Sequence, residues 1–493
     1  MKKILALVVA MLLALGMVSA LAATGADAFL ATSTVSVTVT GVKTGDTLHL
    51  YKLGTPSVDA NNQMTITWNN DEIKEAIVGK TTENWSYSPT AALQAGVAKL
   101  VADNKISVAG NGDYHKEATG TSVQVDVAPG YYLALVRQGD ASKTAKVIYQ
   151  NMLIDAIPEA GEDGIWATHA GVEATVKSTS ESLDKKQQEK GLTTYTDDDI
   201  VGYKFGEYVP FQVTTNIPSY PNNSKEATFE ITDTATGLKL VNNNGYPVTV
   251  KVDGTAVTAG DDTYTLTLAA DGTTMSIAFA KAYILAHPNA AVEVTYSAEL
   301  LGNDNDVEVD VTNNKVKIKY NNNPDESTYQ EPEDEVKEKT YNFTLLKHEK
   351  DNENKALKGA KFTLWDAATE GNKIALKKDG TVYRPIKAGE TADEYIEVGD
   401  DGKATVVGLA KTTYYLQEDI APAGYTRMQT RASVAVSETT STADVDVKVP
   451  NEKGVELPTT GGIGTTIFYI GGSILVLAAV ILLVTKRRMN VND

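Results

Sequence analysis

Three polar side chains in the last third of the sequence interrupt strand faces that are otherwise apolar. They are Lys347, Glu418 and Asn451. Because side chains alternate between the two faces of a strand, Glu418 shares its face with Tyr414 and Leu416. Lys347 and Asn451 follow apolar residues at alternate positions in the same way. Burying any one of them alone would be costly, and burying a charge costs most.

An amide-forming reaction would remove this cost. In an apolar pocket Lys347 tends to lose its proton and Glu418 tends to keep its own. A neutral amine is a nucleophile, and a protonated carboxyl can hydrogen-bond and polarise the carboxamide of Asn451. Attack with loss of ammonia would join the lysine to the asparagine by an isopeptide bond. The competing interpretation is a solvent-facing Lys–Glu pair in an ordinary sandwich.

The middle of the chain repeats this pattern. Lys185 lies near the start of the region, Asp233 in the middle and Asn314 on the last strand, each on an apolar face. The alternatives are Lys186, Asn313 and Asn321. The first two are shifted by one residue and fall on the opposite face, and the third is the weaker rival.

The residues around Lys347, Glu418 and Asn451 resemble the Cna B-type domain. The stretch LKGAKFTLWD (357–366) resembles that family's LxGAxFxL, and YYLQEDIAPAGY (414–425) resembles the E-box of Gram-positive pilins, YxLxExxAPxGY. The resemblance implies a bond between Lys347 and Asn451, on the first and last strands, with Glu418 as the catalytic residue.

The earlier domains resemble parts of the same proteins. The stretches FGEYVPFQVTTNIP and ITDTATGL resemble the middle domain of pilin shaft subunits, which implies a Lys185–Asn314 bond with Asp233 as the catalytic acid. In the first domain VAPGYYLALVRQG echoes the E-box, but Leu135 takes the place of the glutamate. We therefore expect no bond in the first domain.

The N-terminus has the pattern of a secretory signal. Lys2 and Lys3 precede an apolar run, and Ala20 and Ala22 offer small residues for cleavage, which predicts a signal peptide over 1–23. An uncleaved anchor is the alternative.

The C-terminus combines a pentapeptide, an apolar segment (463–485) that is long enough to span a bilayer, and a basic cytoplasmic tail (486–493). The pentapeptide is Leu457, Pro458, Thr459, Thr460 and Gly461. The three parts together resemble the LPxTG cell-wall sorting signal of Gram-positive bacteria. The resemblance implies that a sortase cleaves after Thr460 and holds it as an acyl-enzyme until an amine attacks. A plain single-pass anchor is the alternative.

A polymerising subunit also needs a lysine that accepts Thr460 of its neighbour. Shaft pilins carry this lysine in a VYPK-like strand at the end of the first domain, and the resemblance falls on Lys177. Thr175 and Val176 replace Tyr-Pro here, so the motif is degenerate. Strand alternation over Val172–Lys177 places the lysine on the exposed face.

Short alternating runs between Gly, Asn and Asp turns predict an all-β fold of tandem Ig-like β-sandwiches, and 493 residues suffice for three domains. Helices are expected near Ser88–Asp103 and Ala280–His287. The expected parts are an N-terminal pilin domain (24–176), a middle isopeptide-forming domain (178–325), a linker (326–339) and a Cna B-type domain (340–453).

Composition excludes several classes of function. A net charge of −19 argues against nucleic acid and anionic lipid as partners, and the absence of cysteine excludes disulfides. No His-Glu-x-x-His or G-x-S-x-G motif is present, and the acidic loop Asp197–Asp199 lacks EF-hand spacing. We expect no cofactor, no metal and no enzymatic turnover beyond one self-reaction in each cross-linked domain.

These observations together indicate the shaft subunit of a sortase-assembled pilus that is secreted and joined to the cell wall and that supports adhesion. The expected partners are pilin-type and housekeeping sortases, identical subunits, tip or basal pilins, and peptidoglycan. The alternative is a monomeric wall-anchored adhesin or a minor or basal pilin. The sequence does not identify a host receptor.

Overall fold

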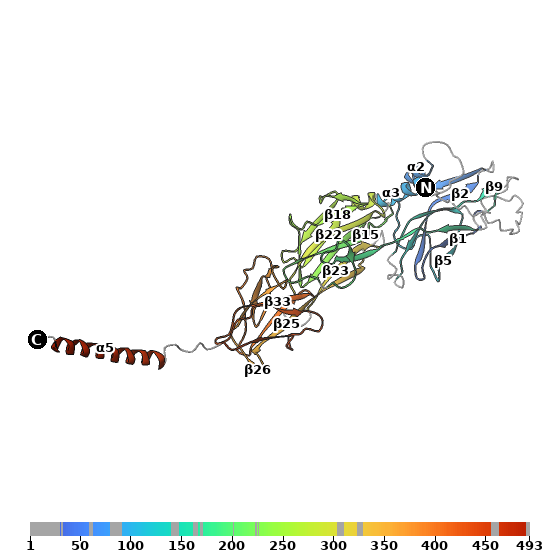
Figure 1. Cartoon of the computed structure of the whole chain (residues 1–493). Coiled ribbons are helices and arrows are strands. Elements are labelled where there is room, and N and C mark those ends of the chain that lie inside the picture. The colour runs from blue at the N-terminus through green and yellow to red at the C-terminus, as the bar shows by residue number, and fades with distance from the viewer. Residues whose placement is uncertain are drawn as a thin grey trace, which may run out of the picture.

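Strands dominate the protein, and three β-rich domains follow one another along its length (Figure 1). The helix α5 (Ile463–Met489) follows the third domain. The all-β tandem architecture predicted from the sequence is confirmed. The computed structural model describes residues 30, 33–58, 63–78, 91–139, 147–160, 166–167, 171–200, 202–221, 224, 226–302, 310–322, 329–454 and 463–489.

The first domain combines small sheets with two helices. Its strands are β1 (Val35–Thr40), β2 (Thr47–Val58), β3 (Met64–Trp68), β4 (Tyr114–Glu117), β5 (Ser122–Val127), β6 (Gly130–Arg137), β7 (Val147–Tyr149), β8 (Met152–Ala156), β9 (Glu159–Ala160), β10 (Trp166–Ala167), β11 (Val172–Thr175) and β12 (Ser178–Ser180), and its helices are α2 (Asp71–Val78) and α3 (Ala91–Ala102). One sheet has the order β11-β1-β5, and another has the order β3-β2-β6-β8. Strand β12 pairs with β7, so residues 178–180 belong to this domain's sheets.

The middle domain is a sandwich of two sheets. Its elements are β13 (Leu183–Gln188), β14 (Tyr195–Thr196), β15 (Tyr208–Asn216), β16 (Phe229–Thr236), β17 (Leu238–Val241), β18 (Thr249–Val252), β19 (Thr255–Val257), β20 (Tyr264–Leu268), β21 (Thr274–Phe279), α4 (Lys281–Ala286), β22 (Ala291–Leu300), β23 (Asp310–Asn321) and β24 (Tyr329–Gln330). One sheet runs β14-β13-β15-β22-β18-β19, and the other begins β20-β21-β16-β23. Strand β15 alternates between buried and half-buried residues along its whole length, as expected for one sheet face packed on a core.

The third domain is a second sandwich. Its strands are β25 (Glu333–Glu349), β26 (Asn352–Ala356), β27 (Lys361–Trp365), β28 (Lys373–Ile374), β29 (Leu376–Asp379), β30 (Val382–Pro385), β31 (Ile396–Glu397), β32 (Lys403–Leu409), β33 (Thr413–Ile420), β34 (Ala432–Ala435) and β35 (Val447–Asn451). One sheet runs β25-β32-β30-β29 with β35 beside β25, and the other runs β28-β27-β33-β34. Both sheets contribute to one apolar core.

Much of the expected linker over 326–339 is a strand. Residues 333–340 form the first part of β25 and pair with β23 of the middle domain, and the same strand continues into the third domain. The linker was expected because this range is acidic and contains proline. In the structure, residues 333–339 of this range instead form a paired strand. The two domains are therefore joined by a paired strand.

A tight backbone contact also joins the middle and third domains. The backbone N–H of Phe205 donates to the carbonyl oxygen of Gly408 at 3.0 Å. Gly408 has φ +69°, and a Cβ added there would lie 2.2 Å from the Phe205 ring. The position therefore requires glycine for both its conformation and the close approach.

The helical expectations agree with the described residues. Helix α3 lies within the expected 88–103, of which 88–90 fall outside the described residues, and α4 lies within 280–287. Helix α2 was not anticipated. The part of α5 from Thr466 to Arg488 is long and apolar enough to cross a membrane, and none of its apolar window is buried within the protein.

We expect Gly408→Ala to destabilise the protein by about 1–3 kcal/mol or more, because the methyl group meets Phe205 and a left-handed φ disfavours alanine. The measurement is the melting temperature of the ectodomain. Gly380→Ala is the matched control, because Gly380 has φ +58° with nothing within 4 Å of an added Cβ. Equal shifts for the two variants would show that the Phe205 contact contributes nothing.

Candidate functional site

Lys347, Glu418 and Asn451 meet inside the third domain. Lys347 lies on β25 and Asn451 on β35, which pair in parallel, and Glu418 projects from β33 in the facing sheet. The three residues are 0%, 1% and 2% exposed, respectively. The strand-face argument placed them in the core, and this is where they lie.

The three side chains contact one another directly. The Nζ of Lys347 donates to the carboxamide oxygen of Asn451 and, at 3.0 Å, to the carbonyl oxygen of Val449. It also lies 3.3 Å from Oε1 of Glu418. The Nδ2 of Asn451 donates to both carboxyl oxygens of Glu418 at 3.0 Å each. The amine, the amide and the carboxyl are therefore placed for a reaction among themselves.

The surroundings favour the neutral amine of Lys347. Burial lowers the pKa of Lys347 to about 8, although the nearby Glu418 acts in the opposite direction. The aromatic ring of Phe362 forms part of this environment, with its centroid 5.9 Å from Nζ. The lowered pKa brings the neutral, nucleophilic form of the amine closer to neutral pH than that of an ordinary lysine.

The middle domain brings Lys185, Asp233 and Asn314 into one buried site. Lys185 comes from β13 in one sheet, and the other two come from the adjacent strands β16 and β23 in the facing sheet. None of the three is more than 1% exposed. Lys185 Nζ donates to the Asp233 carboxylate, and burial lowers the pKa of Lys185 while Asp233 opposes that shift.

Tyr296 lies at the centre of this site and was missed by sequence reasoning. Its hydroxyl accepts from Lys185 Nζ at 2.5 Å and from Asn314 Nδ2 at 3.4 Å, and it donates to Asp233 at 2.5 Å. Burial raises the pKa of Tyr296 well above its ordinary value, so the hydroxyl keeps its proton. The sequence offered one signal. On its strand face, the polar tip of Tyr296 lies between the apolar residues Val294 and Ala298.

The one-residue alternatives point away from the core. Lys186 forms an ion pair with Asp184 at 2.9 Å, and Asn313 donates to Glu335 at 3.1 Å, both on the outer face. Asn321 is buried but lies at the far end of β23, where it pairs with Tyr329. The burial pattern therefore favours Lys185 and Asn314 over these residues.

Lys177 is exposed in the short connection between β11 and β12, two residues beyond the end of β11. Its carbonyl oxygen accepts from the Gln150 N–H at 2.9 Å, which holds the backbone while leaving the amine accessible.

In the first domain Leu135 is buried on β6 opposite His49. The pentapeptide Leu457–Gly461, with Thr460, and the signal segment 1–23 lie outside the described residues.

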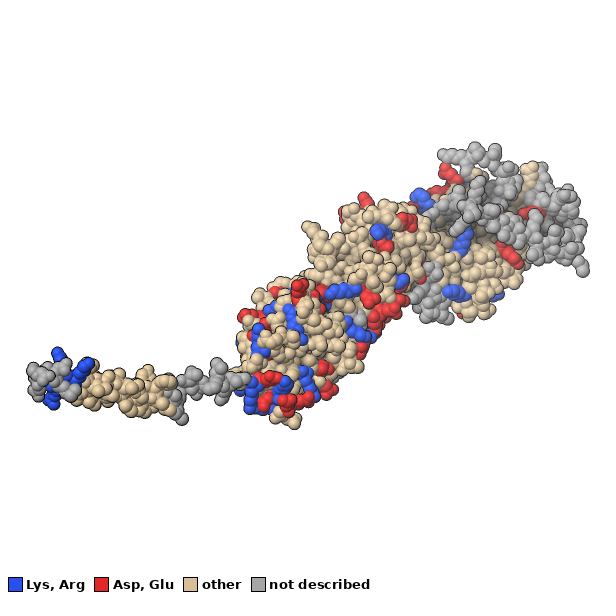
Figure 2. All heavy atoms as spheres, viewed as in Figure 1, with Lys and Arg blue, Asp and Glu red and all other residues tan. Residues whose placement is uncertain are grey.

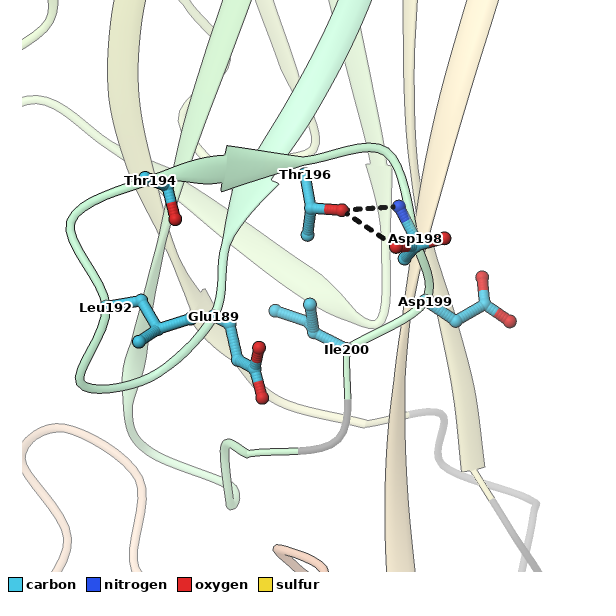
Figure 3. Close-up of a pocket in the computed structure, with 7 residues that line it drawn as sticks. All are labelled: Glu189, Leu192, Thr194, Thr196, Asp198, Asp199 and Ile200. Atoms are coloured by element: carbon cyan, nitrogen blue, oxygen red, sulfur yellow. Dashed lines mark hydrogen bonds between the residues drawn. The ribbon is translucent and has the colours of Figure 1, made fainter.

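The acidic loop at Asp197–Asp199 borders a hollow of about 260 Å³ (Figure 3). The hydroxyl of Thr196 donates a hydrogen bond to the Asp198 carboxylate at 3.1 Å, and Asp199 forms an ion pair with Lys339 at 2.6 Å. Within the described part of the chain, no group of three His, Cys, Asp or Glu residues is placed to hold a metal ion. The surface near the third domain intersperses basic and acidic residues (Figure 2).

Two parts of the sequence match known families. Residues 342–451 match the SpaA prealbumin-like fold domain, and residues 449–491 match the LPXTG cell wall anchor motif. None of the curated proteins compared with the chain matches it.

The fold resembles those of two solved pilins. The T6 backbone pilin of serotype M6 Streptococcus pyogenes is 17% identical with a TM-score of 0.55, over 82% of this chain and 80% of that one. The full-length major pilin SpaD from Corynebacterium diphtheriae is 18% identical with a TM-score of 0.51, over 86% of this chain and 98% of that one. At these identities the similarity shows a shared fold.

The fold and the anchor together define the class of protein. The chain has the fold of backbone pilins, with a prealbumin-like third domain. Its C-terminal anchor motif makes it a surface protein that is attached covalently to the cell wall.

We expect an Asn451→Ala ectodomain, in which Lys347 cannot react, to become more stable as the pH rises from about 8 to about 10.5. The folded-state pKa of Lys347 is lowered to about 8, so the folded state binds fewer protons than the unfolded state across this window. The gain relative to an Asn451→Ala, Lys347→Met control is on the order of 3 kcal/mol, measured by denaturant unfolding at each pH. Parallel pH profiles for the two variants would contradict the lowered pKa.

Proposed function

We propose that the chain is the shaft subunit of a covalent surface pilus that supports adhesion. A sortase joins Thr460 of one subunit to Lys177 of the next, and each subunit is stabilised by Lys185–Asn314 and Lys347–Asn451 isopeptide bonds. The observation that carries this proposal is the pair of buried Lys–acid–Asn clusters that lie between the two joining points. The pilin fold and the anchor motif support the same class.

The third-domain reaction uses only groups that are already in contact. The amine of Lys347 attacks the carboxamide carbon of Asn451, a C–N bond forms, and the bond to Nδ2 breaks. Glu418 lies 3.3 Å from the attacking nitrogen and 3.0 Å from the leaving one, so it can carry a proton between them. The leaving nitrogen departs as ammonia, and no external reagent is consumed.

The middle-domain reaction follows the same course. Lys185 is the nucleophile and Asn314 is the electrophile. Asp233 and the Tyr296 hydroxyl share the proton network that links the two. Each sandwich would carry out this step once, on its own side chains. The reaction therefore has no turnover.

The positions of the two bonds decide how a fibre would carry tension. A load between Thr460 and Lys177 would pass from Asn451 directly to Lys347, and from Asn314 directly to Lys185. Most residues of the two sandwiches, 348–450 and 186–313, would then lie outside the loaded path. Each loop spans roughly 100 residues or somewhat more, so each cross-link removes about 4.7 kcal/mol or slightly more of unfolded-state entropy by loop-closure reasoning.

We expect the mass of the purified ectodomain to fall below the sequence mass by two molecules of ammonia. Glu418→Ala is expected to restore one of them, because only the third-domain reaction loses its proton carrier. Asp233→Ala is expected to restore the other.

The measurement is intact mass spectrometry, followed by identification of the branched peptides. Asp184→Ala is the control, because Asp184 pairs with Lys186 outside the core and its variant should keep both losses. An unmodified wild-type mass would rule out the self-cross-linking part of the proposal.

We expect cells that carry Lys177→Ala to lose the ladder of covalent high-mass species on denaturing gels and to keep wall-attached monomer. We expect this loss because, in the proposed function, the exposed amine of Lys177 accepts Thr460 of the neighbouring subunit. Lys116→Ala, another exposed first-domain lysine, is the control and should polymerise normally. An intact ladder in the Lys177 variant would exclude this lysine. A wild-type chain without any ladder would favour a monomeric wall-anchored adhesin.

A further inference from the structure

A second buried carboxyl group, Glu338, lies at the middle-domain site. It projects from β25, the strand that continues into the third domain, and it is 1% exposed. Its cross-strand partner on β23 is Thr312, which is fully buried. The mechanism described above leaves this group without a role.

The contacts of Glu338 leave one of its oxygen atoms unused. Thr312 Oγ1 donates to Oε2 of Glu338 at 2.5 Å. Among the described residues, Oε1 of Glu338 is buried without a hydrogen-bond partner, and so is the carboxamide oxygen of Asn314. Each unpartnered buried polar atom carries a desolvation cost, which a hydrogen bond formed in another state of the site would remove.

These two unpartnered atoms belong to diagonal neighbours on one sheet face. In the antiparallel pairing of β23 with β25, Thr312 is opposite Glu338 and Asn314 is opposite Val336. Diagonal positions in such a pair lie about 7–8 Å apart, which long side chains can span. A protonated Glu338 would therefore supply the donor that the Asn314 carbonyl group lacks.

We propose that Glu338 is the acid of the middle-domain reaction, donating a hydrogen bond to the Asn314 carboxamide oxygen, while Asp233 acts as the base toward Lys185. This inference rests on the proposed Lys185–Asn314 bond and divides the acid and base roles between two residues.

The charges around Glu338 support this division. Lys185 faces it from β13 and Asp233 from β16, in addition to Thr312 from β23. Burial raises the pKa of Glu338 to about 8, and the hydrogen bond from Thr312 and the charge of Lys185 only partly oppose this shift. Glu338 therefore holds its proton at neutral pH. Glu338 and Asp233 are two carboxyl groups at one site, which is a usual arrangement for an acid–base pair.

The proton balance closes without another reactant. Lys185 gives one proton to Asp233, and its neutral amine attacks the Asn314 carbonyl carbon while Glu338 stabilises the developing oxyanion. The second amine proton moves to the departing nitrogen as its bond to carbon breaks. The resulting ammonia takes the proton from Asp233 and leaves as ammonium, so both carboxyl groups return to their starting forms.

The test follows bond formation in unfolded, unreacted ectodomain that is recovered from inclusion bodies and refolded by dilution at a series of pH values. The branched Lys185–Asn314 peptide is quantified by mass spectrometry over time. The Lys347–Asn451 peptide in the same samples is the internal control for folding. We compare the wild type with Glu338→Gln, which keeps a neutral donor, and with Glu338→Ala, which removes it.

We expect Glu338→Ala to slow middle-domain bond formation by about 10²-fold or more while the third-domain bond forms at the wild-type rate. We expect the wild-type rate to decline above about pH 8 as Glu338 ionises, and this alkaline decline to be absent in Glu338→Gln. If Glu338 had only a structural role, the Glu338→Gln substitution would not abolish the alkaline decline in rate.

Equal rates and equal pH profiles in all three proteins would overturn the assignment of Glu338 while leaving the proposed bond intact. A wild-type chain that forms the third-domain bond but never the middle-domain bond would instead refute the bond on which the inference rests.

Discussion

The burial of two lysine amines is the constraint on which the middle and third domains depend. Lys185 and Lys347 are both completely buried, and an isolated buried ammonium group would be very costly. Each therefore needs a carboxyl group within the same pocket, and in both domains that carboxyl group, Asp233 or Glu418, comes from the facing sheet. The sandwich must be assembled before the groups meet, so the proposed reaction would follow folding. A resulting bond would resist unfolding and would not guide the folding itself.

Strand β25 connects the two sites more directly than a linker could. Its first part pairs with β23 and carries Glu338 into the middle-domain site, and its second part carries Lys347 into the third-domain core. The Phe205–Gly408 backbone bond and the Glu299 carboxylate, which accepts from the Ala388 N–H at 2.6 Å, add contacts across the same junction. The relative orientation of the two domains therefore depends on hydrogen-bonded strands.

Strand alternation allowed much of the fold and most of the candidate site residues to be predicted from the sequence. Side chains alternate between the two faces of a strand with a period of two. A shift of one residue, from Lys185 to Lys186, therefore moves the side chain to the opposite face. Tyr296 was missed because a tyrosine in an apolar row looks like ordinary core. Glu338 was missed because Val336 is its only apolar neighbour on the inward face, which is too little to reveal alternation in a charged segment. Its partners are distant in sequence, so composition alone could not indicate burial.

The expectation that the first domain has no cross-link agrees with where tension would enter a fibre joined through Lys177. Lys177 lies beyond β11, at the end of the first domain, and a load applied there would pass onward to Lys185 without crossing residues 33–176. A covalent bond within that domain would therefore carry no load. Leu135, buried where the related motif has a glutamate, can contribute apolar packing at no mechanical cost. On this reasoning, buried reactive lysines belong only in domains that lie between the two joining points of the fibre.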